Sequence, residues 1–205
     1  MLDISITADL RKIERKLGDL AARQVPFATA RALTLLAKDV QAAEQEQLRQ
    51  RLDRPTPFTL RSIRVRPAIK ATLEARVIVQ DIAAAYLLPF EFGGPHKLIG
   101  RGITWLNPKG AGWALLNQYG NFPARTLQRL KKAKNVYTGT IRGVGGVWLR
   151  QGRQLHLLIR FGDAQDVRQR IGYRERAAAV VRANTKKRFG EALAYAIATS
   201  TSKNP

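Results

Sequence analysis

The feature that most constrains this chain is a run of 71 consecutive residues, from Phe92 to Gly162, that contains no Asp or Glu. The run holds 12 Lys and Arg residues, so ion pairs within it cannot neutralise its charge. It also contains the three tryptophans of the chain, so its composition differs from that of a plain disordered tail. We therefore expect this segment to present a basic, partly aromatic surface to an anionic partner.

The whole chain carries the same imbalance of charge. Its 205 residues include 36 Lys and Arg against 15 Asp and Glu, which gives a formal net charge of +21. This charge favours nucleic acid, an acidic protein surface or a lipid headgroup layer as the partner, without choosing among them. Apolar residues make up 45% of the chain, enough for the core of one domain, with or without an insertion. The absence of cysteine excludes disulfides and thiolate metal sites.

Export and membrane signals are not expected in this sequence. The N-terminus lacks a basic region followed by an apolar one. The longest apolar run, Ile82 to Phe90, is far shorter than the roughly 20 residues that a membrane-spanning helix needs. The sequence therefore predicts no membrane partner.

Two helices are expected in the first quarter of the chain. The spacing of the leucines and isoleucine predicts an amphipathic helix over residues 7–24, with Thr7 as its N-cap and a break at Val25-Pro26. A second helix is predicted from about Pro26 to Leu52, because proline suits a first helical turn. Its expected buried stripe consists of Phe27, Ala30, Leu33, Ala37, Val40 and Glu44.

Strands are expected after the two prolines that follow this helix. Alternation of apolar and polar residues predicts strands near residues 63–66 and 72–79, and these two runs could pair. A short helix is then expected from Ile82 to Leu88, ended by Pro89.

The acid-free run itself predicts a mixture of elements. Residues 93–125 are rich in Gly, Pro and Asn and are expected to be irregular. A short basic helix is predicted from Leu127 to Lys134, and Val144 to Gly146 are expected to form a flexible lead-in. Residues 147–149 and 155–161 are predicted to form a hairpin around the turn at 151–153.

The last predicted helix runs from Tyr173 to Thr199. Its expected buried stripe recurs at multiples of four and consists of Ala177, Val181, Phe189, Leu193 and Ile197. The predicted fold class is therefore α+β: a small antiparallel sheet packed with two long helices, plus an extended Gly/Pro-rich arm. The predicted division is an N-terminal amphipathic helix over 1–24, a folded body over 25–92 and 147–198, a basic arm or insertion over 93–146, and a flexible tail over 199–205.

No set of residues predicts catalysis. His96 and His156 lie far apart without an acidic partner nearby, and no cluster of His, Asp or Glu has metal-ligand spacing. The glycines between residues 93 and 112 match no phosphate-binding loop, and no serine lies in a nucleophile-elbow pattern. We expect no enzymatic activity, no cofactor and no metal.

The basic and aromatic residues are the candidate site. Arg125, Arg129, Lys131, Lys132 and Lys134 could hold phosphates without reading bases. No helix-turn-helix, zinc-finger or RNA-binding-sheet signature accompanies them, which argues against a sequence-specific regulator. The remaining candidates are basic residues and tryptophans that could anchor an interface, although each tryptophan could equally belong to the core: Arg142, Arg150, Arg153, Trp105, Trp113 and Trp148.

Three ordered stretches carry a resemblance to a phage protein family. The first spans Ala43 to Ile78 and includes Phe58-Thr59-Leu60 and Leu73-Glu74-Ala75-Arg76-Val77. The second joins Ala85-Tyr86-Leu87-Leu88-Pro89 and Glu91-Phe92-Gly93-Gly94 to Leu116-Asn117-Gln118-Tyr119-Gly120-Asn121. The third runs from Gly146-Val147-Trp148-Leu149-Arg150 through Phe161 and Tyr173 into the basic last helix. In this order the set resembles the prophage minor tail protein Z family, related to the tail-completion and neck proteins of tailed phages.

The resemblance, which excludes the first 24 residues, implies a non-catalytic virion structural protein. Members act at the head-proximal end of the tail, as tail-completion, collar or head–tail joining subunits, and such subunits usually form six-fold rings. The implied partners are further copies of the chain and other neck, connector and tail proteins, with possible non-specific contact with packaged DNA. The implied location is the virion tail or neck, after assembly in the host cytoplasm.

Two other functions remain as alternatives. A non-specific nucleic-acid-binding protein would bind DNA as a free monomer with a steep dependence on salt. A hydrolase such as a tail lysin is disfavoured, because neither a pair of carboxylates nor a metal cluster is evident.

Overall fold

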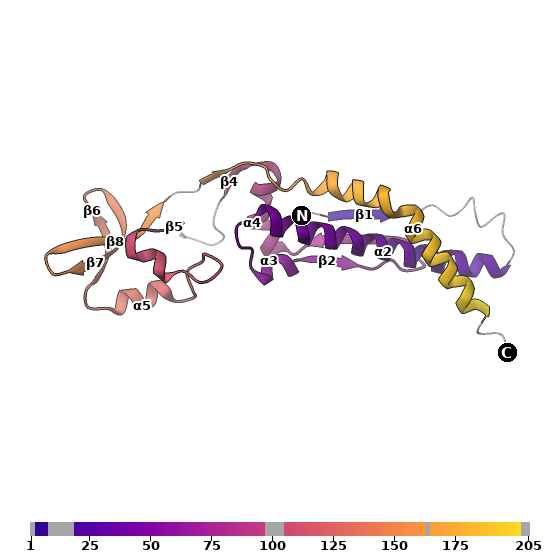
Figure 1. The fold of residues 1–205 in the computed structure, drawn as a ribbon, viewed down its shortest axis with the longest axis horizontal. Coiled ribbons are helices and arrows are strands. Elements are labelled where there is room, and N and C mark those ends of the chain that lie inside the picture. The colour runs from indigo at the N-terminus through magenta and orange to yellow at the C-terminus, as the bar shows by residue number, and fades with distance from the viewer. Residues whose placement is uncertain (1–2, 8–18, 97–104, 163–164, 202–205) are drawn as a thin grey trace.

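The computed structural model describes residues 3–7, 19–96, 105–162 and 165–201 of the chain, and its fold class is α+β, as predicted. The molecule is elongated (Figure 1), with a helical body at one end and a β-rich lobe at the other. The body contains residues 3–7, 19–92 and 173–201, and the lobe contains residues 105–162. A two-stranded ribbon, called the stalk below, lies between them.

Two long antiparallel helices form the frame of the body. Helix α2 (Asp19–Arg51) packs along helix α6 (Tyr173–Thr201). Near one end the contact is made by alanines that are buried on both helices, which lets the backbones approach closely: Ala28, Ala32, Ala192 and Ala196. Further along, Arg188 of α6 forms a bidentate ion pair with Asp39 of α2, in which Nε and Nη2 each lie 2.7 Å from a carboxylate oxygen.

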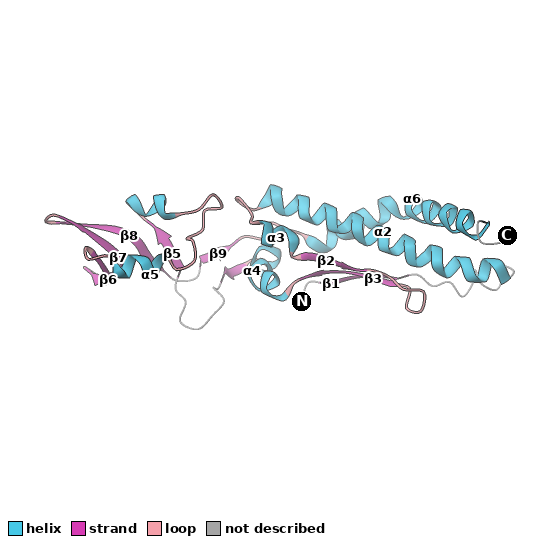
Figure 2. Cartoon of the chain, turned by 90° about the horizontal axis from the view of Figure 1, so that it is seen from below, coloured by secondary structure: helices cyan, strands magenta, loops and turns pink. Residues whose placement is uncertain are grey.

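A three-stranded antiparallel sheet packs against α2 (Figure 2). Its strands are β1 (Asp3–Thr7), β2 (Ile63–Arg66) and β3 (Glu74–Val79), in the order β1-β3-β2. The predicted pairing of the runs near 63–66 and 72–79 is therefore confirmed, with Val65 opposite Val77. Two short helices complete the body: α3 (Pro57–Arg61), capped by Thr56, and α4 (Asp81–Phe92).

The expected separate N-terminal helix is wrong in its described part. Residues 3–7 form strand β1 instead, so Thr7 is not a helix cap, while residues 8–18 lie outside the described residues. Helix α2 begins at Asp19 and continues through Pro26, so the helix break predicted at Val25-Pro26 is absent. A proline removes one backbone hydrogen bond and crowds the preceding turn, and a helix of 33 residues held by tertiary packing tolerates this cost.

The predicted buried stripe is confirmed in α2 but only in part in α6. In α2 the stripe is confirmed, since Ala30, Leu33, Ala37, Val40 and Glu44 are all buried and Phe27 is partly buried. In α6 Ala177 is buried, but Leu193 and Ile197 are exposed, and the buried positions near the C-terminal end are Ala192 and Ala196. A strict spacing of four residues advances about 40° around a helix at each step, so the predicted stripe had rotated away from the core by its end.

The chain leaves and re-enters the body through the stalk. Strand β4 (Gly94–His96) follows α4 and pairs antiparallel with β9 (Gln165–Val167), which precedes α6. Helix α4 continues past Pro89, where it was predicted to end, and stops at Gly93, whose N–H donates to Pro89 O at 2.8 Å and whose φ of 78° suits glycine.

The lobe is a four-stranded antiparallel sheet with two helical segments. Its strands β5 (Trp105–Pro108), β6 (Val136–Ile141), β7 (Val144–Gln151) and β8 (Gln154–Gly162) lie in the order β5-β8-β7-β6. A 3₁₀ segment, η1 (Gly110–Leu115), and helix α5 (Thr126–Lys132) complete it. The lobe has its own small core around Val147, Leu158 and Ile159, against which Leu127 and Leu130 of α5 pack.

The structure places the boundary of the insertion differently from the sequence analysis. The predicted basic helix and the hairpin around residues 151–153 are confirmed. However, residues 147–162 pair with β5 and β6, so this hairpin belongs to the lobe and not to the body. Val144 to Gly146 are not a flexible lead-in but the start of β7, paired with β6, and residues 93–125 contain β4, β5 and η1 where an irregular segment was expected.

Two glycines let segments of the lobe approach each other closely. A Cβ added to Gly112 would lie 1.8 Å from Leu158 O, and one added to Gly146 would lie 2.3 Å from Ile159 O. Both contacts are with backbone atoms of β8, which cannot move aside as a flexible side chain could. By contrast, a Cβ at Gly139 on the neighbouring strand β6 would meet nothing within 4 Å.

A buried cluster of charged residues lies where α6 begins. Glu44 of α2 is 1% exposed, and Arg176 Nε lies 3.3 Å from its Oε1, yet neither carboxylate oxygen accepts a hydrogen bond among the described residues. Burial raises the pKa of Glu44 to about 7; the Arg176 guanidinium opposes this shift, and the Glu91 carboxylate adds to it. Glu91 is itself buried and accepts the Tyr173 N–H, with its two oxygens 3.0 and 2.9 Å from that nitrogen.

None of the described helices is both long enough and apolar enough to cross a membrane.

The close approach at Gly146 gives a first prediction. Gly146→Ala should destabilise the lobe by about 1–3 kcal/mol, because the new methyl group has to displace backbone. Gly139→Ala, on the open neighbouring strand, is the matched control and should change stability by less than about 0.5 kcal/mol. Urea unfolding followed by tryptophan fluorescence measures both, since all three tryptophans lie in the lobe. Equal midpoints for the two variants would contradict the assigned packing.

Burial of Glu44 gives a second prediction, on pH. Folding raises the pKa of Glu44, so the folded state favours the protonated carboxyl more than the unfolded state does. The contribution of Glu44 to the free energy of unfolding is therefore fully present below pH 4.5 and is lost as the pH rises through about 7. The free energy of unfolding should therefore fall by up to ~3 kcal/mol over that range from this group alone. Glu44→Gln should flatten this part of the pH profile, whereas Glu46→Gln, on the exposed side of α2, should not. A Glu44→Gln profile as steep as that of the parent chain would contradict the assignment.

Candidate anion-binding lobe

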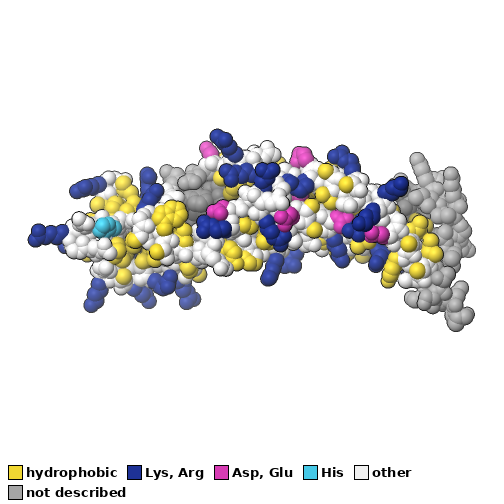
Figure 3. Space-filling view, in the orientation of Figure 1, with side chains coloured by type: hydrophobic (Ala, Val, Ile, Leu, Met, Phe, Trp, Pro, Cys, Tyr) yellow, Lys and Arg dark blue, Asp and Glu magenta, His cyan; other side chains and the backbone are white. Residues whose placement is uncertain are grey.

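The lobe concentrates positive charge without any carboxylate. Residues 105–162 contain no Asp or Glu, and they carry ten Lys and Arg residues. All ten side chains are exposed, including every basic residue predicted for the site. Figure 3 shows dark blue side chains along both edges of the lobe, while the magenta carboxylates visible in that view lie over the body and the stalk.

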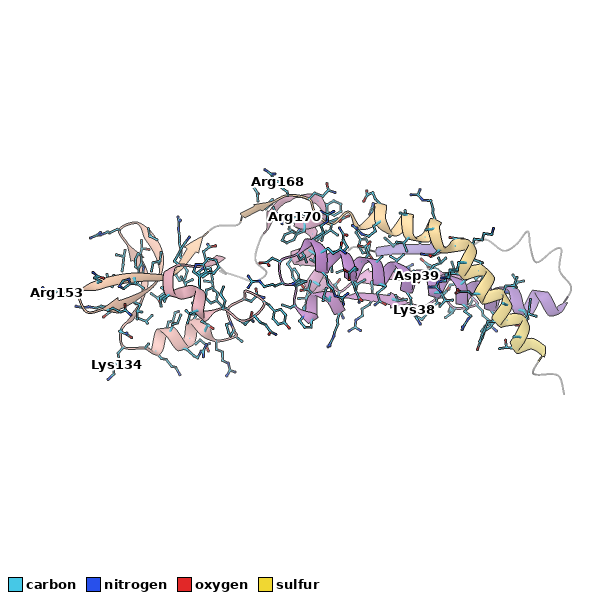
Figure 4. All side chains as sticks on the ribbon, viewed as in Figure 1. Lys38, Asp39, Lys134, Arg153, Arg168 and Arg170 are labelled. Carbon is cyan, nitrogen blue, oxygen red and sulfur yellow. The ribbon has the colours of Figure 1, made fainter. Side chains whose placement is uncertain are left out.

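The first group of predicted cations lies on helix α5 and at its two ends. Arg129, Lys131 and Lys132 lie in the last turn of α5, where positive side chains also interact favourably with the helix dipole. Arg125 precedes the helix in a left-handed conformation with φ of 66°, and its side chain is exposed. Lys134 follows the helix and lies at the edge of the lobe (Figure 4).

The second group of predicted cations lies in or next to the two hairpin turns of the lobe. Arg142 and Gly143 join β6 to β7 with φ values of 50° and 78°, the left-handed pair that a tight two-residue hairpin turn uses. Arg153 lies in the turn between β7 and β8, after Gly152 with φ of 60°, and it sits at the end of the molecule farthest from the body (Figure 4). Arg150, near the end of β7, donates from Nε to Gly152 O at 3.2 Å.

Ion pairing differs between the lobe and the body. Among the described residues, no salt bridge joins a Lys or Arg of the lobe to a carboxylate, whereas several basic side chains of the body are paired, Arg188 with Asp39 among them. The lobe's charges therefore remain available to an external anion, attenuated only by solvent and salt.

The three tryptophans take different positions. Trp113 lies in η1 and is 61% exposed, which fits an interface anchor better than a core residue. Trp148 lies in the middle of β7, half-buried, with Nε1 donating to Gly139 O at 3.3 Å. Trp105 begins β5 opposite Gly162, and its side chain lies outside what the structure describes.

The structure adds residues that the sequence analysis did not single out as part of the site. Tyr137 on β6 and Leu155 on β8 are each 45% exposed, and Arg160 on β8 is exposed. Residues 136–141 are rich in β-branched and aromatic residues and are followed by an Arg-Gly turn, which was a usable signal for β6 and its hairpin. Arg168 and Arg170 extend the basic surface along the connection from the stalk to α6 (Figure 4).

The body offers a weaker candidate site than the lobe does. A groove of the body beside β3 and α4 is lined by Phe58, Ile82, Arg66 and Arg76 among others, with Asp81 as its one carboxylate. Among the described residues, no group of three His, Asp or Glu side chains is placed to hold a metal ion.

Comparison of the chain with protein-family models, with curated proteins and with solved structures found no match. The role of the lobe therefore has to be inferred from its own residues.

The distribution of unpaired charge gives a third prediction. Reversing three cations of the lobe, Arg129→Glu, Lys131→Glu and Lys132→Glu together, should lower heparin affinity by at least about 10-fold at ~0.1 M salt, because several phosphate-like contacts are lost. The matched control reverses Arg182, Lys186 and Lys187 on exposed positions of α6, which changes the net charge equally. Affinity would be measured by titration and by the salt needed for elution from a heparin column. An equal loss in both triple variants would show that net charge, and not the lobe, governs binding.

Proposed function

We propose that this chain is a structural subunit of the neck of a tailed phage or prophage, a ring-forming tail-completion or collar protein that joins the tail to the head connector. Its acid-free lobe is the part that faces an anionic partner, either packaged DNA or an acidic neighbouring protein.

The observation that carries this proposal is the convergence of the three stretches that resemble the minor tail protein Z family. Residues from all three meet around α4. Thr59, from the first stretch, shares a hydrogen bond of 2.8 Å with the Tyr86 hydroxyl, from the second. Tyr173, from the third, donates its backbone N–H to Glu91 and its hydroxyl to Val77 O, at 3.2 Å. Tyr173 thus joins the third stretch to the first and the second by hydrogen bonds in the body, while residues 116–121 and 146–161 of the set lie in the lobe. These contacts support treating the body part of the ordered set as one structural signature and not as unrelated matches.

The charge supports a role in an assembly that contains an anion. A ring brings several copies of a chain with net charge +21 together, and their mutual repulsion opposes closure. An anion in the lumen or on a neighbouring subunit removes that penalty, and the unpaired cations of the lobe are the groups that would contact it. A ring of this protein should therefore be favoured by high salt or by DNA.

Light scattering tests the proposal through the mass of the purified chain. Raising the salt from about 0.15 M to about 0.5 M shortens the screening length from about 8 Å to roughly 4 Å. The proposal predicts a species several times the 22.9 kDa of one chain at the higher salt, or at the lower salt once duplex DNA is added. The triple lobe variant with reversed charges should assemble at low salt without DNA, because its repulsion is reduced.

The alternative function, a non-specific nucleic-acid-binding protein, makes a different prediction in the same experiment. The chain would then stay a monomer at both salt concentrations and bind duplex DNA tightly only at the lower one. That outcome would contradict the neck proposal.

A further inference from the structure

The outer face of the lobe's sheet, turned away from α5, carries a row of aromatic and apolar side chains. In the strand register Tyr137 of β6 lies opposite Trp148 of β7, which lies opposite Leu157 of β8. The next row pairs Arg150 with Leu155. The core beneath, where α5 packs, contains Val136, Val147, Leu149 and Ile159. Leu157 and Ile159 lie on opposite faces because the register of β7 and β8 shifts between Val147 and Trp148. The row of Tyr137, Trp148 and Leu157 therefore lies on the side of the sheet that α5 does not cover.

Glycines keep this outer face flat. A Cβ at Gly146 would point toward it, since it would meet Leu157 Cδ1 at 2.7 Å, and Gly139 beside it has open space. The Trp148 indole donates from Nε1 to Gly139 O, so the ring lies across the neighbouring strand and does not stand away from the sheet. Tyr137, 45% exposed, lies opposite Trp148 in the strand register and therefore on the same face. The result is a level platform with two aromatic rings.

Cations surround the platform, and no carboxylate of the lobe counters them. Arg150 lies on the same face, opposite Leu155, and Arg160 lies opposite Gly146. Arg142 and Arg153 occupy the turns at the two ends of β7. These four side chains are exposed, and none forms an ion pair among the described residues.

These observations indicate which kind of partner the outer face of the lobe binds. A second copy of the lobe would bring like charges into contact, so face-to-face self-association is disfavoured. Duplex DNA hides the faces of its bases in the stack, so its phosphates could contact the arginines but its bases could not use the rings. A single strand exposes both, and surfaces that bind single strands combine a basic track with aromatic rings on which bases stack.

We propose that the outer face of the lobe, centred on Tyr137 and Trp148, binds single-stranded nucleic acid without sequence preference. Bases stack on the two rings, and Arg150, Arg142 and Arg153 hold the phosphates. The proposal does not depend on a place in a virion, because it concerns the lobe alone and is tested on the purified full-length chain.

The test uses a fluorescent oligothymidine of about 20 nucleotides, the corresponding duplex, and polyglutamate of similar length as competitor. Fluorescence anisotropy at about 0.1 M salt should show that the single strand binds more tightly than the duplex. Tyr137→Ala should weaken single-strand binding by about 10-fold, while Tyr137→Phe, which keeps the ring, should bind as the parent chain does. Phe92→Ala removes an exposed aromatic ring from the body, at the end of α4, and should have no effect. Arg150→Gln should lower the salt slope by roughly 0.7, the value of one phosphate contact to a single strand.

Three outcomes would overturn the proposal. The oligothymidine could fail to bind at this salt concentration, Tyr137→Ala could bind it as tightly as the parent chain, or polyglutamate could compete as well as the oligothymidine. The last two results would point to duplex phosphates or an acidic protein surface as the partner. Circular dichroism of each variant ensures that a loss of binding is not a loss of folding, and none of these outcomes depends on the mass of the assembly that tests the neck proposal.

Discussion

The packing of α2 against α6 is the constraint on which the rest of the structure depends. The two helices are antiparallel, so the C-terminal end of α2 and the start of α6 lie at the same end of the pair. Everything between them in the sequence has to leave that end and return to it. The chain satisfies this in two steps: the sheet strands β2 and β3 fold back along α2, and the lobe then projects outward on a stalk whose two strands pair with each other. The lobe is thus an insertion that the body can carry without sharing its core.

This arrangement separates two uses of charge. Carboxylates of the body are committed to structure: Asp39 joins α6 to α2, and Glu91 holds the first residue of α6 through its backbone N–H. Glu44 is also buried, and burial destabilises its charged form, which is why its pKa is raised. The lobe contains no Asp or Glu and therefore folds without such carboxylate interactions of its own. It relies on a small apolar core, on close backbone contacts at two glycines and on hairpin turns, and within the part of the chain that the structure describes its cations have no carboxylate partner.

The sequence predicted much of the body because its patterns there are local. The stripe in α2 combines steps of three and four residues, which keeps it on one face of a helix, and it was correct. The stripe in α6 used steps of four alone, and its far end rotated onto the surface, where Leu193 and Ile197 are exposed. Strand β1 was missed because its partner, β3, lies about 70 residues away in sequence, and nothing local reveals such a pairing.

The site was predicted as a list of residues but not as a surface. The predicted cations are exposed and form no ion pair among the described residues, and a run without carboxylates allows no ion pair within itself. A partly aromatic surface was expected, but the arrangement of its rings on one face was not, because it requires the register that places Tyr137 opposite Trp148, and β6 itself was not expected. The assignment of residues 147–162 to the body failed for the same reason: a strand shows its periodicity but not its neighbours.

The central claim is that the lobe, and not the basic surface as a whole, meets the anionic partner. Acetylation of lysines, followed by mass spectrometry with and without a saturating polyanion, tests it most directly. Among the residues that the structure describes, four exposed lysines lie in the lobe, Lys109, Lys131, Lys132 and Lys134, and four lie in the body, Lys38, Lys70, Lys186 and Lys187 (Lys134 and Lys38 are labelled in Figure 4). The account predicts that DNA slows acetylation of the lobe lysines several-fold and leaves the body lysines unchanged. Equal protection of both groups, or stronger protection of the body, would contradict it.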